Sequence, residues 1–259
     1  MTKLSKYQPG QFSWIDLMSP DAAAAKSFYQ ALFGWDATDN PTDQGGVYTQ
    51  FTCEGQMVAG LGQMGEEMKS ARVPATWNSY VSVQDVEACA ARAAELGGSV
   101  VMPPMQVMDA GKMAIISDPT GAALSLWQAG QHVGAGLVNE PTSLCWNELA
   151  TNDTERAAAF YRELFSWSLS DADGSGYLMI ENQGQMNGGI RALGDEQANL
   201  PPHWMAYVAV EDCDACCARS TDLGAGVIVP PMDIPPGRFA VIADPQGAVL
   251  TVMKLNQPD

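Results

Sequence analysis

Histidine and basic residues are scarce in this chain of 259 residues. It has two histidines, His132 and His203, and 13 lysines and arginines against 30 aspartates and glutamates, which gives a net charge of −17. Because His132 lies near the middle of the chain, outside both halves, and His203 is in the second half, neither half has two imidazoles for an iron site of two histidines and one carboxylate, and we expect no such site. Nucleic acids and anionic membrane surfaces require clustered cations, so we expect neither as a partner.

Long apolar runs and a disulfide framework are also missing. The chain has no run of about 18 apolar residues, and its start, MTKLSKYQPGQFSW, has no apolar signal region. We therefore expect neither a membrane-spanning segment nor a secretory signal. The cysteines are too scattered for a compact set of disulfides, which predicts reduced thiols and a cytoplasmic protein. They are Cys53, Cys89, Cys145, Cys213, Cys216 and Cys217.

The chain repeats itself. WIDLMSPDAAAAKSFYQALFGW at 14–35 returns as WNELATNDTERAAAFYRELFSW at 146–167, and DPTGAALSL at 118–126 returns as DPQGAVLTV at 244–252. Each copy has roughly 125 residues, enough to enclose a core of its own. We therefore predict two similar domains, at 8–129 and 141–256, joined by a linker near 129–142.

Each half reads as strand, helix, strands and then the same again. Ser19-Pro20-Asp21 is typical of a helix start, and Gly34 of a helix end. Asp85 and Asp212 are expected to cap the second helix of their halves, and short strands interrupted by Pro-Pro follow. The pattern predicts an α+β fold of four βαβββ-like units.

Alternation along the strands separates a helix-facing side from a cavity-facing side. Ile15 and Leu17 should face the helices, which leaves Trp14 and Asp16 on the opposite face. Val81 and Val83 should face the helices in the second unit. The two copies are therefore expected to present equivalent residues to equivalent cavities.

These motifs, in this order, resemble the vicinal oxygen chelate superfamily, which includes glyoxalases, bleomycin-resistance proteins, extradiol dioxygenases and fosfomycin-resistance enzymes. The resemblance is carried by a capping aspartate with Phe-Tyr seven residues later, by LFGW and LFSW, by LGG at 96–98, and by the DPTGA and DPQGA turns. It covers nearly the whole chain and is strongest to the tandem-domain, glyoxalase-like subgroup. It implies two tandem domains in which the strands of two βαβββ modules curve around a cavity.

The resemblance also implies where metal ligands would stand, counted from the capping aspartates. The positions are Trp14, Asn78 and Ser125 in the first half and Trp146, Met205 and Thr251 in the second, with a fourth within 60–63 or 189–191. None of the six is a good ligand for a divalent metal. We therefore expect no metal and no other cofactor, which argues against the metal-dependent chemistry of the superfamily.

Two carboxylates, Asp16 and Glu148, hold equivalent cavity-facing positions and are the candidate catalytic residues. Burial beside tryptophan would raise the pKa of such a carboxyl, which would suit a base or a grip on a cationic ligand. The alternative is a structural carboxylate bonded to neighbouring strands or to the other domain.

Aromatic residues are expected to floor each cavity, as in sites for flat organic ligands. In the first domain the candidate ligand-binding residues are Trp14, Asn78, Tyr80, Ser125 and Trp127. In the second they are Trp146, Tyr207 and Thr251, beside Met205 and Met253. The first set is more mixed in polarity, so we expect the better pocket there. Alternatively, these side chains simply fill a collapsed barrel.

The sequence favours a protein that binds a small organic metabolite or xenobiotic without a catalytic metal. The alternative is an enzyme, either a glyoxalase-type lyase or isomerase or a metal-independent acid–base catalyst that uses Asp16 or Glu148. A third possibility is an interaction protein with closed cavities. The sequence leaves the ligand, catalysis and the oligomeric state open.

Overall fold

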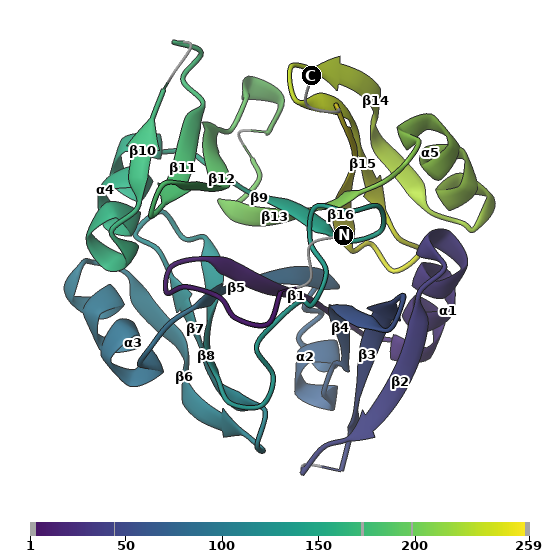
Figure 1. The fold of residues 1–259 in the computed structure, drawn as a ribbon, viewed down its shortest axis with the longest axis horizontal. Helices are drawn as coiled ribbons and strands as arrows, with labels where there is room; N and C mark the ends of the chain where they lie inside the picture. The colour runs from purple at the N-terminus through teal and green to yellow at the C-terminus, as the bar shows by residue number, and fades with distance from the viewer. Residues whose placement is uncertain (1–3, 44, 172–173, 198, 257–259) are drawn as a thin grey trace.

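The computed structural model describes residues 4–43, 45–171, 174–197 and 199–256, and each half of the chain forms one eight-stranded mixed sheet (Figure 1). The first half contains β1 (Phe12–Ser19), α1 (Ala22–Phe33), β2 (Asp36–Pro41), β3 (Val47–Cys53), β4 (Gln56–Gln63), α2 (Glu66–Ser70), β5 (Thr76–Ser82), α3 (Val86–Glu95), β6 (Ser99–Val107), β7 (Gly111–Ser117) and β8 (Ala123–Ala129). The second contains β9 (Leu144–Thr151), α4 (Thr154–Phe165), β10 (Ser168–Ser170), β11 (Leu178–Asn182), β12 (Gln185–Ala192), the 3₁₀ helix η1 (Asp195–Gln197), β13 (His203–Ala209), α5 (Cys213–Asp222), β14 (Gly226–Ile234), β15 (Gly237–Ala243) and β16 (Val249–Leu255).

The strand order is the same in both sheets. It is β2-β3-β4-β1-β5-β8-β7-β6 in the first and β10-β11-β12-β9-β13-β16-β15-β14 in the second. The central pair is antiparallel, β1 with β5 and β9 with β13, and each central strand has a parallel neighbour on its other side. The predicted α+β fold of four βαβββ units is confirmed, and the sheets do not close into barrels.

The helix starts follow from their caps. Asp21, Asp85, Asp153 and Asp212 are the N-cap residues of α1, α3, α4 and α5, and each side chain accepts a hydrogen bond from the backbone N–H three residues on. Gly34 ends α1 with a left-handed φ of 72°. Within the described chain no helix is long and apolar enough to cross a membrane.

The Pro-Pro pairs do not interrupt their strands, contrary to expectation. β6 runs through Pro103-Pro104 and β14 through Pro230-Pro231, and the pairing register shifts at these places. Both are edge strands, where a proline that cannot donate to the ladder is tolerated at a bulge.

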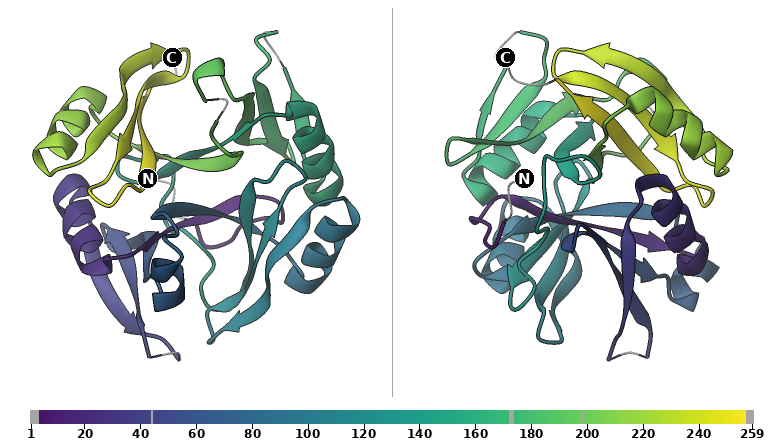
Figure 2. Two further views of the ribbon diagram at one scale, coloured as in Figure 1. Left: turned by 180° about the vertical axis from the view of Figure 1, so that it is seen from behind. Right: turned by 45° about the vertical axis from the view of Figure 1, so that its right-hand side comes forward.

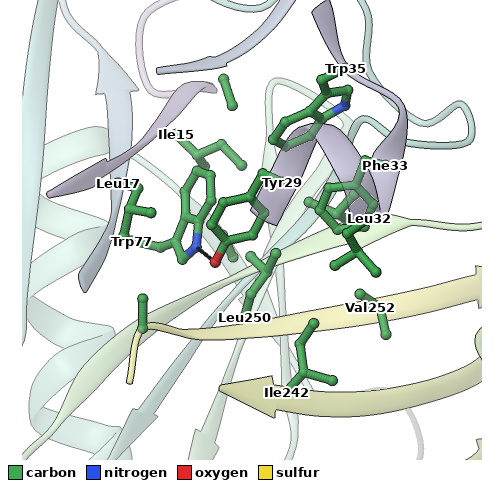
Figure 3. Packing of buried hydrophobic residues seen from close by; sticks show 14 of the residues in the cluster. Ile15, Leu17, Tyr29, Leu32, Phe33, Trp35, Trp77, Ile242, Leu250 and Val252 are labelled. Carbon is green, nitrogen blue, oxygen red and sulfur yellow. Dashed lines mark hydrogen bonds between the residues drawn. The ribbon is translucent and has the colours of Figure 1, made fainter. Parts of the chain in front are cut away.

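The helix-side faces of the two sheets pack against each other. Figures 1 and 2 show α1 beside α5 and α3 beside α4. One core joins Ile15, Leu17 and α1 with Ile242, Leu250 and Val252 of the other half (Figure 3). The second core joins the α3 side of the first half with the α4 side of the second, and includes Val81 and Val83. Each main core is therefore shared between the halves, instead of belonging to one half as expected.

A buried hydrogen-bonded chain crosses this interface. Trp77 Nε1 donates to the Tyr29 hydroxyl at 2.9 Å, and that hydroxyl donates to Asp244 Oδ2 at 3.1 Å (Figure 3 shows the first bond). Asp244 also accepts from the backbone N–H groups of Gln246 and Ala248, which shapes the turn before β16. A side chain of α1 thus anchors a turn of the other half.

The pseudo-symmetric position repeats the arrangement. Trp204 Nε1 donates to the Tyr161 hydroxyl at 2.9 Å. Burial, together with the charge of the neighbouring Asp118, raises the pKa of Tyr161 well above its ordinary value. Asp118 in turn accepts from the backbone N–H groups of residues 120–122, so the turn before β8 is built like that before β16.

Replacing Tyr29 tests how much this chain stabilises the protein. Tyr29→Phe leaves the Trp77 N–H and an Asp244 oxygen buried without their partner, so we expect a loss of about 1–3 kcal/mol of unfolding free energy. Urea denaturation measures it. Ser27→Ala, on the exposed side of α1, should stay within about 0.5 kcal/mol of wild type. Equal stabilities of Tyr29→Phe and Ser27→Ala would contradict the role assigned to the chain.

Candidate functional site

The cavity-facing side of the first sheet has Asp16 at its centre. Asp16 is 5% exposed and accepts three hydrogen bonds, from Tyr80 Oη at 2.9 Å, Asn78 Nδ2 at 2.9 Å and Tyr48 Oη at 3.2 Å. All three donors are neutral. Asp16 pairs across the sheet with Gly60 and Asn78, so β1, β3 and β5 together build this carboxylate–phenol centre.

Neighbouring residues fix the Tyr48 hydroxyl in place. It accepts a hydrogen bond from Trp14 Nε1 at 3.0 Å. It also lies over Gly60, where a Cβ would overlap the phenol oxygen. Gly60 is therefore required by close approach, and the tryptophan that opens the first strand serves as a donor to the centre as well as part of its floor.

Burial controls the electrostatics of this centre. It raises the pKa of Asp16, and the hydrogen bonds from Asn78, Tyr80 and Tyr48 oppose that rise. Burial and the charge of Asp16 raise the pKa of Tyr48 and Tyr80 well above their ordinary value. The two phenols therefore remain proton donors, and the carboxylate is stabilised by neutral groups alone.

The second sheet repeats the centre with one addition, and with Met205 in the position of Asn78. Glu148, 7% exposed, replaces Asp16, and Tyr177 and Tyr207 stand where Tyr48 and Tyr80 stand. Trp146 Nε1 donates to the Tyr177 hydroxyl at 3.0 Å. Here Arg191 Nε also donates to Glu148 Oε1 at 2.8 Å, so the second carboxylate is part of an ion pair.

The remaining predicted site residues lie on the same two faces. Trp14, Tyr80 and Trp127 form one apolar cluster, with Ser125 hydrogen-bonded to Tyr80. Met205, Tyr207 and Met253 cluster on the second face with Trp146, and Thr251 Oγ1 donates to Met205 Sδ at 2.7 Å. The structure thus brings the members of each predicted set together on one face.

The linker covers the first face. Its backbone is tied down by hydrogen bonds from Ala135 N–H to Ser13 and from Gly136 N–H to Met57, both at 2.8 Å. Trp127 Nε1 donates to the His132 carbonyl at 2.8 Å. The His132 ring stands edge-on to the Trp14 ring, with 4.5 Å between centroids. The residues between the halves therefore pack onto the cavity-facing side of the first sheet.

Exposure differs between the two faces as a consequence. On the first, Trp14, Tyr80 and Trp127 are 3%, 5% and 6% exposed beneath the linker. On the second, Tyr207 and Met253 are equally buried, at 6% and 3%, but Trp146, the equivalent of Trp14, is half-buried, as is Phe239. The expectation that the first domain holds the better pocket remains a prediction, and the covering linker weighs against it.

The residues present do not fit a divalent metal. Asp16 already accepts hydrogens from three donors, and tryptophan, amide and hydroxyl side chains surround it, with no second carboxylate or imidazole from the expected positions. On the second face Glu148 is bonded to a guanidinium. Across the residues that the structure describes, no three His, Cys, Asp or Glu side chains form a group suited to a metal.

Sequence reasoning missed Tyr48 and Tyr177, and it placed His132 only in the linker. The two tyrosines are detectable in principle, because both precede a Gly-containing turn by seven residues in the aligned copies. Lys112 in β7 and Arg238 in β15 form surface ion pairs with Glu87 and Asp214.

Comparison with known proteins agrees with this architecture. Residues 11–126 match the Glyoxalase/Bleomycin resistance protein/Dioxygenase superfamily, and residues 145–253 match the Glyoxalase-like domain. The chain is 42% identical to CFP32 of Mycobacterium tuberculosis (strain CDC 1551 / Oshkosh), named a "putative glyoxylase", over 98% of both chains. It is 35% identical to the anthracycline biosynthesis protein DauV of Streptomyces sp. (strain C5), over 98% of this chain and 96% of DauV. The chain belongs to the glyoxalase/bleomycin resistance protein/dioxygenase superfamily.

Solved structures support the fold. The Mn(II)-bound glyoxalase from Novosphingobium aromaticivorans superposes with a TM-score of 0.66 at 16% identity, covering 97% of this chain and 84% of that one. The 2,3-dioxygenase LapB from Pseudomonas sp. KL28 also gives 0.66, at 14% identity, covering 98% and 96%. At these identities the likeness concerns the arrangement of strands and helices.

His132 makes the stability of the first face depend on pH. Neither ring nitrogen has a hydrogen-bond partner among the described residues, and burial lowers its pKa from 6.5 to about 4. The unfolded chain takes up this proton first as pH falls below 6.5, so folding should weaken from there down to about pH 4. The loss at pH 5 should be about 2 kcal/mol.

Urea unfolding at pH 7.5 and pH 5 measures this loss in wild type and in His132→Phe, which keeps a ring against Trp14 but cannot take up a proton. The raised pKa of Asp16 works in the opposite direction in both proteins and cancels in the comparison. The same pH dependence in the two proteins would refute the role of His132.

Proposed function

We propose that this protein binds a small planar organic molecule on the cavity-facing side of its second sheet, without a catalytic metal. The observation that carries the proposal is the pair of half-buried rings, Trp146 and Phe239, beside the hydrogen-bonded centre around Glu148. Apolar walls with a few oriented polar groups are the usual composition of a small-molecule site. The first face has the same design but lies beneath the linker.

The relatives support the class of ligand. DauV matches the chain over almost its full length and is named for anthracycline biosynthesis. Anthracyclines contain flat fused rings, and flat rings gain from contact with aromatic side chains such as Trp146. From this relative we extend to our protein only the class of ligand, a molecule with flat fused rings.

The donor set supports the metal-free part of the proposal. A carboxylate that accepts hydrogens from phenols, or that binds an arginine, has its lone pairs directed at those donors. The superfamily's metal-dependent reactions therefore find no suitable ligands at these centres, and we propose none of them here.

A second candidate function is acid–base catalysis by Asp16. The observation that favours it is the rise in pKa that burial causes, since a raised pKa brings the proton affinity of a carboxyl closer to that of an effective general acid or base. The covering linker counts against it, because a substrate must reach Asp16. Glu148 is bonded to Arg191 and serves better as an anchor for that side chain than as a free base.

Substituting the equivalent tryptophans decides between the two faces. A panel of fused-ring acids, amides and amines is screened by thermal shift, because a ligand that binds the folded state raises its stability. Trp146→Ala should weaken the best compound about ten-fold or more through lost ring contact, measured by equilibrium dialysis. Trp14→Ala, once shown to fold, should leave its affinity unchanged.

The reverse pattern, with only Trp14→Ala weakening the compound, would return the site to the first face. A panel without any binder would contradict the proposed function. Stoichiometric iron, nickel, zinc or manganese bound at these centres, after purification without a metal-affinity tag, would contradict its metal-free part.

A further inference from the structure

Arg191 is the charged residue that distinguishes the two cavity-facing centres. Glu148 pairs across the sheet with Gly189, and Asp16 pairs with Gly60. Two residues further along the same strands stand Arg191 in the second sheet and Gly62 in the first. The duplicated centres are therefore matched in carboxylate and phenols. They differ in that Met205 replaces the amide donor Asn78, and in that Arg191 adds a guanidinium.

The backbone places Arg191 on the cavity side of β12. Gly189 lies beneath the Tyr177 hydroxyl on that side, and Ile190 is fully buried in the shared core. Alternation along the strand returns Arg191 to the cavity side. Its bond to Glu148 agrees with this position.

The guanidinium is held firmly at two of its three nitrogens. Nε donates to Glu148 at 2.8 Å, and Nη1 donates to Gln197 Oε1 at 2.8 Å and to the Ala192 carbonyl at 3.2 Å. Nη2 has no acceptor within residues 4–43, 45–171, 174–197 and 199–256, and the side chain is 26% exposed. A fixed arginine with one nitrogen still able to donate is suited to recognising a planar anion.

The charges around this donor are negative, so any attraction for an anion has to come from Arg191 itself. The chain has a net charge of −17, and η1, which carries Gln197, also carries the exposed acids Asp195 and Glu196. The acids on η1 offer an anionic ligand no electrostatic attraction. Such a ligand would meet an unpaired acid at Asp16 on the first face, where neutral groups are the only donors. Arg191 is therefore the group at these two centres that can favour an acidic ligand.

We propose that the second face takes a planar ligand with an anionic oxygen substituent, a carboxylate or phenolate, and that Arg191 Nη2 donates to that oxygen. The ring of the ligand would lie against Trp146, and Glu148 would hold the guanidinium in position. This inference rests on the proposed function, because it specifies the ligand of the same site.

Three naphthalene probes of similar size test the charge preference: 2-naphthoate, 2-naphthamide and 2-naphthylmethylammonium. We expect wild type to bind the naphthoate about ten-fold more tightly than the amide, because the guanidinium forms a stronger hydrogen bond with a carboxylate than with a neutral amide oxygen. The ammonium should bind most weakly. Arg191→Gln should remove the preference and leave the affinity for the amide near wild type. Arg191→Lys, which keeps the positive charge, should retain part of the preference for naphthoate.

Glu148→Gln should act in the opposite direction and strengthen naphthoate binding, because the guanidinium is no longer neutralised. If Arg191→Gln folds poorly with Glu148 left unpaired, the double variant Glu148→Gln/Arg191→Gln removes both charges and should show no preference. Arg162→Gln, on the exposed face of α4, is the matched control and should behave like wild type.

The outcomes separate the two proposals. Equal binding of the three probes by wild type, or a naphthoate preference that survives Arg191→Gln, overturns the role of Arg191 and leaves the ligand site standing. Failure of all three probes to bind contradicts the proposed function itself.

Discussion

The structure depends on the contact between the helix-side faces of its two sheets. α1 packs against strands of the second half, and Tyr29 reaches across to the turn at Asp244. Since each main core combines residues of both halves, apolar burial stabilises the two halves together. Ser79, which donates to Asn147 at 2.6 Å, ties the central strands at the same interface. The cavity-facing sides are thereby directed away from each other, and each is backed by a rigid shared core.

The sequence predicts whatever is set by neighbouring residues. The aspartate caps, the end of α1 at Gly34 and the alternation that buries Ile15 and Leu17 are local, and the structure has them. The partner of each core is not local. Nothing in the pattern says that α1 would pack on the strands of the other half, because its apolar face is equally compatible with a core inside its own half. The Pro-Pro pairs also read as interruptions until the strands are known to lie at sheet edges.

The sequence predicts the positions of the two carboxylates in the candidate site, but not their partners. Alternation placed Asp16 and Glu148 on the cavity side, and the duplication made them equivalent. The phenols that hold them lie elsewhere in the chain, Tyr48 in β3 and Tyr177 just before β11. The repeat shows that the two tyrosines are equivalent, but their place over Gly60 and Gly189 depends on the sheet order. The position of His132 could not be predicted from the sequence, because the path of the linker depends on the hydrogen bonds that it forms with the folded sheet.

The two centres share a structural role for the carboxylate and differ in its partners. A carboxylate beneath a tyrosine ties the β3 or β11 hairpin to the central strand in both halves, so this structural task is common to the two copies. On the first face the linker covers this centre, and the carboxylate has only neutral partners. On the second, glutamate is one methylene longer than aspartate and binds Arg191, which converts a buried negative charge into a neutral pair with a donor to spare. The charged group that can select a ligand therefore lies on the face with the half-buried tryptophan, where a ligand need not displace the linker.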